Sequence, residues 1–220
     1  MRIRRAVPLS LLVVAAVAAT PALAGAKLAP AKPLAWTDMA GDANVFNDQG
    51  GLAPAPLPES AGPAQWDAAD VLGVTFARLD NGKKLLGMTV TMKLTGAPSQ
   101  GVLYRVTGSA ANCTVFWFQY NWTAGGSGAP TLRHDCVDST SATAAVSNTV
   151  SIPIDGKVVG SSIVWTLLLK DLPPGVKVGS IISPALGEVR GIVGAAGTSA
   201  VTAPVIDQTP TQTSAYKIGQ

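Results

Sequence analysis

The sequence predicts an all-β fold, an antiparallel β-sandwich, and three observations support this prediction. Val, Thr, Ser, Ala and Gly are abundant while only 13% of the residues are charged, a composition that favours strands and turns. Apolar and polar residues alternate over short segments that turn residues separate. No segment after residue 24 shows helical periodicity. We expect a single domain over residues 36–220 with about eight or nine strands, and a closed β-barrel is the alternative.

The clearest strand covers residues 85–94, where alternate apolar side chains from Leu86 to Leu94 share one face. The strand before it, 71–79, places Val74 and Phe76 on one face, and the alternation extends to Leu72. The segment 80–82 (Asp-Asn-Gly) predicts a hairpin turn, because Asn-Gly readily adopts positive φ angles. The remaining strands are expected at 101–107, 113–122, 131–137, 149–154, 161–169 and 185–192.

Residues 1–24 have the pattern of an export signal. Arg2, Arg4 and Arg5 form a basic start, residues 9–19 are apolar, and Ala22-Leu23-Ala24 matches a small-residue cleavage site. The apolar stretch is short for a membrane anchor, which is the alternative. We therefore predict a secreted protein that is cleaved near Ala24, with residues 25–35 as a disordered linker before the domain.

The charge balance excludes two classes of partner. The chain has 16 Lys and Arg residues and 13 Asp and Glu residues. Removal of the three signal arginines makes the two numbers equal, so the mature protein is expected to be neutral. No run of basic residues remains that could neutralise several phosphates, so we expect no nucleic-acid partner and no attraction to anionic lipid. No later apolar segment is long enough to span a membrane.

Cys113 and Cys136 are the only cysteines, and the predicted export places them in an oxidising compartment. We therefore expect a disulfide between them. With His134 they could instead contribute to a metal site, but the usual close pairing of cysteines and a fourth ligand are missing.

The opening loop of the domain carries a cluster of oxygen ligands. Calcium prefers six to eight carboxylate, amide and backbone oxygens on a bent loop. The candidate ligands are Asp38, Asp42, Asn44 and Asp48, with Asn47 beside them. Asp, Asn and Gly also simply make turns, and this reading remains open. Asp67, Asp70 and Asp207 could complete the shell only if the fold brings them close.

The same segment, Asp38-Met39-Ala40-Gly41-Asp42, resembles the D-P-x-G-D opening of secreted bacterial β-sandwich domains described as DOMON-like or similar to family 9 carbohydrate-binding modules. Met39 stands where the usual residue is Pro. The resemblance to these domains continues at later positions, which are Asn44, Asp48, Asp70-Val71, Ile206-Asp207 and Ser214-Ala215-Tyr216. The resemblance implies a β-sandwich, calcium at the opening loop, and a sugar or other small ligand in some relatives.

Aromatic residues are concentrated in the strand expected at 113–122. By alternation Phe116, Phe118, Tyr120 and Trp122 share one face, while Trp117 points to the other. Trp122 adjoins a Gly-rich turn, where loops and ligands meet. We expect Tyr120 and Trp122 to bind a ligand by stacking on sugar rings, with Phe116 and Phe118 in the core; the alternative is that these aromatics are all core.

Catalysis finds little support in the sequence. His134 is the only histidine, no Gly-x-Ser-x-Gly motif accompanies it, and Asp135 next to it points to the opposite face of a strand. We therefore expect a non-enzymatic binding module whose partner is a glycan or another component of the cell envelope. We expect no organic cofactor, and we expect calcium to support the module at its opening loop. A structural or adhesion protein without a small ligand is the second hypothesis, and a hydrolase using His134 is the third.

Overall fold

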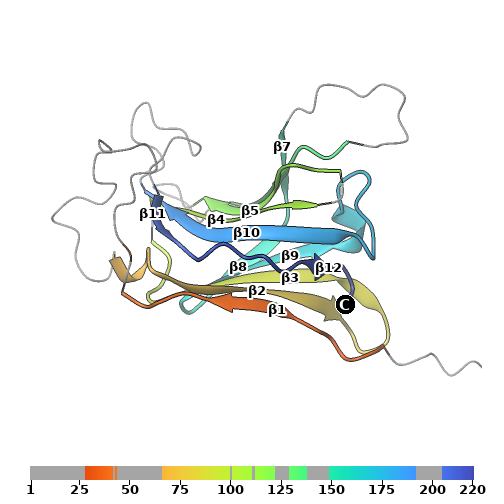
Figure 1. Ribbon diagram of the computed structural model, residues 1–220, viewed down its shortest axis with the longest axis horizontal. Coiled ribbons are helices and arrows are strands. Elements are labelled where there is room, and N and C mark those ends of the chain that lie inside the picture. Colours follow the sequence, from red (N-terminus) through yellow and green to blue (C-terminus); the bar gives the residue numbers. More distant parts are fainter. Residues whose placement is uncertain are drawn as a thin grey trace, which may run out of the picture.

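The computed structural model describes residues 28–41, 43, 66–99, 101–110, 112–121, 129–137, 149–191 and 205–220. Two antiparallel sheets pack face to face over these residues (Figure 1). The sheets remain separate in the described part of the chain, so the predicted β-sandwich is confirmed. The predicted export signal lies outside the described residues.

The first sheet has five strands in the order β1-β2-β3-β9-β8. Their bounds are β1 Leu34–Thr37, β2 Val71–Asp80, β3 Leu85–Leu94, β9 Ser162–Leu168 and β8 Asp155–Val159. A short 3-10 helix, η1 (Leu169–Asp171), follows β9. The long central strands β2 and β3 are the hairpin that the sequence predicts.

The second sheet has the order β11-β10-β4-β5-β6-β7, and β12 pairs with β10 beyond this path. Its strands are β11 Val205–Gln208, β10 Ile181–Arg190, β4 Leu103–Ala110, β5 Phe116–Asn121, β6 Ala129–His134, β7 Val150–Pro153 and β12 Tyr216–Lys217. The described residues therefore form more strands than the eight or nine expected. The additional ones, β1, β8, β11 and β12, are too short to show a distinct alternation.

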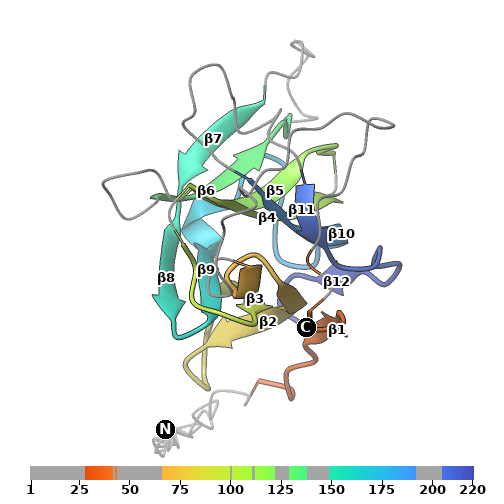
Figure 2. The ribbon, with the colours of Figure 1, turned by 90° about the vertical axis from the view of Figure 1, so that its left-hand side faces the viewer.

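Only Ile154 separates β7 in the second sheet from β8 in the first. Its side chain is buried, and its backbone N–H donates to the carbonyl of Pro130 on β6 at 3.1 Å. The chain thus passes from one layer to the other within a single residue. Figure 2 shows β7 and β8 on one side of the sandwich and β1 and β11 on the other.

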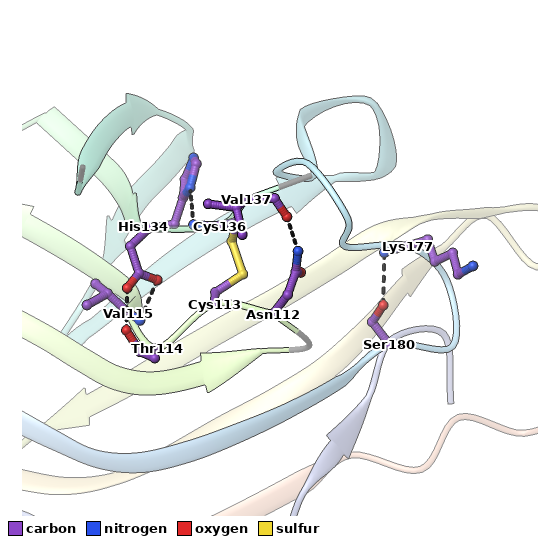
Figure 3. The surroundings of a disulfide bond; sticks show 10 residues. Asn112, Cys113, Thr114, Val115, His134, Cys136, Val137, Lys177 and Ser180 are labelled. Carbon is purple, nitrogen blue, oxygen red and sulfur yellow. Dashed lines mark hydrogen bonds between the residues drawn. A yellow bond between two sulfur atoms is a disulfide. The ribbon is translucent and has the colours of Figure 1, made fainter. Parts of the chain in front are cut away.

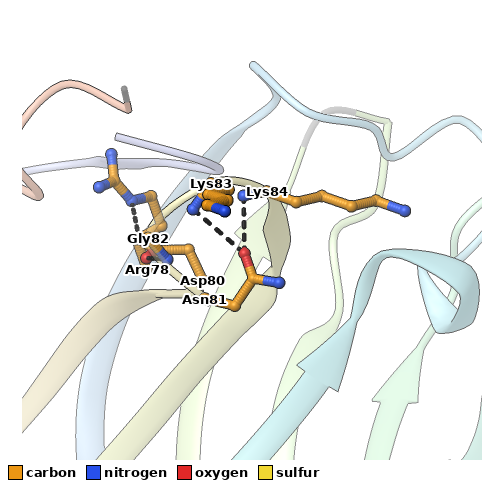
Figure 4. A network of polar contacts seen from close by, with 6 residues as sticks. All are labelled: Arg78, Asp80, Asn81, Gly82, Lys83 and Lys84. Atoms are coloured by element: carbon orange, nitrogen blue, oxygen red, sulfur yellow. Dashed lines mark hydrogen bonds and ion pairs between the residues drawn. The ribbon is translucent and has the colours of Figure 1, made fainter. Parts of the chain in front are cut away.

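The turn between β2 and β3 forms as predicted, with Gly82 at φ +82°. The Asn81 side-chain oxygen accepts from the backbone N–H groups of Lys83 and Lys84, at 3.1 and 2.8 Å (Figure 4). The Asp80 carboxylate accepts from the Gly82 N–H at 2.8 Å and from Arg78 Nε at 2.6 Å. These two bonds lower the pKa of Asp80.

One expectation for β2 is wrong, because the pairing of β2 with β3 shifts between Val71 and Gly73. This bulge turns Val71 into the core and leaves Leu72 only half-buried. Gly73 has φ +149°, and a Cβ there would lie 2.4 Å from the carbonyl oxygen of Trp36 on β1. A glycine is therefore needed where β1 approaches β2.

The core lies between the two sheets and centres on aromatic rings from both. Phe76 of β2 contacts Phe118 of β5 edge-on at 5.9 Å and Tyr216 of β12 at 5.7 Å. The ring of Trp165 on β9 lies 6.5 Å from Phe118 and donates its Nε1–H to the carbonyl of Gln119 at 2.8 Å. Apolar burial and the buried hydrogen bond of Trp165 therefore both join the two layers in this part of the core.

Candidate functional site

Strand β5 separates its aromatic residues between the core and the outer face of the seven-stranded sheet. Phe116, Phe118 and Tyr120 are buried, whereas Trp117 lies on the opposite face and is only half-buried. The expectation that Tyr120 is accessible is therefore wrong: it is 5% exposed, because the alternation that buries Phe118 continues through it. This burial raises the pKa of Tyr120. Trp122, the other predicted ligand-binding residue, lies outside the described residues.

Trp117 interacts with two arginines on the neighbouring strands. Arg133 of β6 is its direct cross-strand partner, and the guanidinium carbon lies 5.5 Å from the centre of the indole. Arg105 of β4 pairs with Gln119 and is therefore diagonal to Trp117, at 4.3 Å from the ring centre. Both distances lie within cation–π range.

Glu188 of β10 faces Arg105 directly across the sheet and forms an ion pair with it. The other carboxylate oxygen of Glu188 accepts from Arg190 at 3.2 Å. Burial lowers the pKa of Arg105, the carboxylate of Glu188 opposes this effect, and the charges of Arg190 and Arg133 add to the lowering. Arg105 therefore lies in a local excess of positive charge.

An open groove of about 430 Å³ runs beside this cluster. Arg105, Glu188 and Trp117 line it together with the hydroxyl-bearing residues Thr107, Ser109, Thr114 and Ser183. An indole surrounded by hydroxyls and guanidinium groups suits a small polar ligand, since the ring supplies apolar contact and the polar groups supply orientation.

The opening loop meets the start of β2, where two predicted accessory carboxylates also lie. Asp38 donates its backbone N–H to the carbonyl of Leu72 at 3.0 Å. Asp70 accepts from the Gly41 N–H at 2.8 Å and from the Thr95 hydroxyl. Asp207 accepts from the Val71 N–H at 2.6 Å. The fold thus brings Asp70 to Gly41 of the predicted loop, and it brings Asp207 to Val71, the residue that follows Asp70. Asp67 is exposed.

Asp42, Asn44 and Asp48 lie outside the described residues. Within the described ranges, no three His, Cys, Asp or Glu side chains are grouped so that they could hold a metal ion. One observation nevertheless fits a cation. Asp70 is 2% exposed, and its Oδ1 atom is buried with no hydrogen-bond partner among the residues that the structure describes. A bound cation would compensate for the desolvation of such an oxygen.

Cys113 and Cys136 form a disulfide, as predicted (Figure 3). They lie just before β5 and just after β6, at the open end of that hairpin. The disulfide engages both thiols, so the alternative metal site at these cysteines is not formed.

His134 is buried beside this disulfide, and its Nδ1 atom accepts from the backbone N–H of Cys136 at 3.3 Å (Figure 3). Burial lowers its pKa, and the charge of Asp135 partly opposes this. Asp135 bonds instead to the hydroxyl of Thr114 and, at 2.8 Å, to the N–H of Val115. Asp135 is thus engaged away from His134, and in the described residues the hydrogen bond of His134 goes to the backbone rather than to the Ser and Asp side chains that a Ser–His–Asp arrangement requires.

The sequence interpretation missed Arg105, Arg133 and Glu188. The outward direction of Trp117 followed from alternation, but its neighbours depend on strand order and register. Arg133 is recognisable only when the register of the β5–β6 hairpin is known. Glu188 lies on β10, which pairs with β4 across a long separation in sequence.

No family model, no curated protein and no solved structure matches the chain. The described residues contain no helix of the length and apolarity that crossing a bilayer requires. The function must therefore be inferred from the site itself.

Proposed function

We propose that the protein is a secreted, non-catalytic binding module, and that its ligand is a carbohydrate bound on the outer face of the seven-stranded sheet. The observation that carries this proposal is Trp117, which is half-buried and lies between Arg105 and Arg133 at the edge of an open groove. Sugar rings present apolar faces that pack on indole, and hydroxyls that pair with the Thr and Ser side chains lining this groove.

The proposal of a non-catalytic role is supported by the position of His134. Its Nδ1 atom accepts from the backbone, and its ring is buried among core residues. Calcium support at the opening loop is part of the same proposal. The resemblance of the opening segment favours it, and so does the buried Oδ1 atom of Asp70. Export is supported by the predicted signal.

The test measures binding of purified residues 25–220 to a panel of soluble oligosaccharides by calorimetry. Trp117→Ala should abolish the binding while leaving the melting temperature nearly unchanged, because the side chain is outside the core. Tyr120→Phe is the matched control and should bind normally, since Tyr120 faces the core.

Trp122→Ala tests the remaining sequence-based prediction in the same experiment. If saccharide binding depends on Trp122 and not on Trp117, the binding site is at the Gly-rich turn and not on the outer face of the sheet. If no saccharide binds to the folded protein, the carbohydrate function is wrong, and the structural or adhesion hypothesis becomes the better explanation.

A further inference from the structure

The outer face of the seven-stranded sheet has more positive than negative charge around its aromatic centre. Arg105 and Arg190 both form ion pairs with the carboxylate of Glu188. Arg133 has no ion pair among the residues that the structure describes, and its charge adds to the repulsion that Arg105 experiences. An additional anion at this face would relieve that repulsion.

The donors of this cluster are held in place before any ligand arrives. The guanidinium groups of Arg105 and Arg133 pack against the indole of Trp117, at 4.3 and 5.5 Å from its centre. Arg105 is also fixed by its buried ion pair with Glu188, whereas Arg133 is only half-buried. A planar guanidinium presents a fork of N–H groups that matches a carboxylate. Arg133 is therefore the cation best placed to meet a ligand.

We propose that the ligand of this face is an acidic saccharide, a chain carrying uronate carboxylates, and that Arg133 pairs with the carboxylate while Trp117 contacts the sugar ring. This inference rests on the proposed carbohydrate function and specifies its ligand class. The hydroxyl-bearing residues along the groove, Thr107, Ser109 and Ser183, suit the hydroxyls of the same chain. Arg105 and Glu188 act as positioning residues that hold the Trp117 ring.

The test compares oligogalacturonate with the same oligomer after methyl esterification, which removes the charge and keeps the chain. The acid should bind at least about ten-fold more tightly, as expected for one charge-assisted contact. Increasing the salt concentration should weaken binding of the acid and leave the ester unaffected.

Arg133→Gln should remove the preference for the acid, and Arg133→Lys, which keeps the charge without the planar fork, should retain part of it. Lys93→Gln is the matched control. Lys93 is an exposed cation on β3 of the five-stranded sheet, so its loss changes the net charge equally and should leave the preference intact. The melting temperature of each variant confirms that it is folded.

Equal binding of acid and ester, dependent on Trp117, would overturn the acidic ligand and leave the carbohydrate function standing. A preference for the acid that persists in Arg133→Gln, or that Lys93→Gln also removes, would overturn the role of Arg133. Failure of every saccharide to bind would overturn both proposals. Tighter binding of oligothymidylate or dextran sulfate than of oligogalacturonate would replace the uronate with a phosphate or sulfate ligand.

Discussion

At the scale of single residues, adjacent aromatic side chains in β5 have opposite environments. Phe118 is buried and contacts the rings of Phe76, Phe116 and Trp165. Trp117, one residue earlier, contacts two arginines on the outside of the sheet. The same strand thus contributes both to the stability of the core and to the candidate binding face.

The first prediction compares these two neighbours. Phe118→Ala should lower the free energy of unfolding by about 3–5 kcal/mol, because it removes buried area and leaves a cavity. Trp117→Ala should lower it by about 1 kcal/mol or less, since only cation–π and surface contacts are lost. Urea denaturation followed by circular dichroism measures both. A Trp117→Ala variant as unstable as Phe118→Ala would contradict the assignment of Trp117 to a binding face.

The second prediction concerns the pH dependence that His134 introduces. Its pKa is lowered in the folded protein, so the unfolded chain takes up the proton more readily. Stability should therefore be complete above the unfolded-state pKa of about 6.5 and should decrease as the pH falls below it. Once the pH is below the folded-state pKa as well, the loss levels off.

Urea midpoints at several pH values between 5 and 8 measure this effect, and His134→Gln should flatten the profile in that window. The lowered pKa of Asp135 acts in a separate window, below the ordinary aspartate pKa of 3.8, where the stabilisation by that carboxylate is lost. An unchanged slope in His134→Gln would assign the pH dependence to another group.

At the scale of elements, the disulfide closes the hairpin of β5 and β6 at its open end. The two cysteines are separated by 23 residues in sequence. In the chain-entropy model, a crosslink over this distance stabilises the native state by about 3 kcal/mol, because it restricts the unfolded chain.

The third prediction is that the double variant Cys113→Ala, Cys136→Ala unfolds at a lower urea concentration than the oxidised protein. Reduction of the native protein should have a similar effect. Thiol labelling of the denatured, unreduced protein should detect no free thiol. Equal stability of the oxidised and double-variant proteins would show that the crosslink adds little to this hairpin.

Long strands could be predicted from the sequence. In β3, apolar and polar residues alternate over ten residues, and this period of two is incompatible with a helix. The core positions Met88, Val90 and Met92 followed directly from it. The error at Leu72 has a local cause: a bulge changes the face of each residue on one side of it, and alternation alone cannot detect the extra residue. The short strands β11 and β12 depend on pairing with β10 rather than on their own pattern.

The candidate site was only partly predictable for a related reason. Trp117 could be placed on the outer face from its own strand. The charge cluster around it requires β10 beside β4, a pairing between segments far apart in sequence that no local signal specifies. The expectation that Tyr120 is accessible failed because it relied on the nearby Gly-rich turn, whereas alternation on β5 already assigned Tyr120 to the face of Phe118.

At the scale of the whole molecule, the fourth prediction is that calcium increases the melting temperature. A ligand that binds only the native state stabilises it by mass action. Asp70→Asn should lose this increase, because it removes the charge of a carboxylate whose Oδ1 atom is buried and has no partner within the described part of the chain. Asp155→Asn, an exposed carboxylate on β8, is the control and should keep it.

Differential scanning calorimetry with calcium, magnesium or chelator measures this shift. A melting curve that calcium leaves unchanged would mean that the opening loop is only a turn. The readout is the calcium-dependent shift and not the melting temperature itself, so a destabilising effect of Asp70→Asn does not obscure the result.

The single-residue crossing at Ile154 makes the two long sides of the sandwich unequal. On the side of β7 and β8, a covalent link of one buried residue holds the layers together. On the side of β1 and β11, side-chain hydrogen bonds fasten them, from Trp36 Nε1 to the Thr209 hydroxyl at 2.9 Å and from the Val71 N–H to Asp207 at 2.6 Å. A covalent link of one residue is harder to separate than two hydrogen bonds, so we expect any local separation of the two layers to begin on the side of β1 and β11.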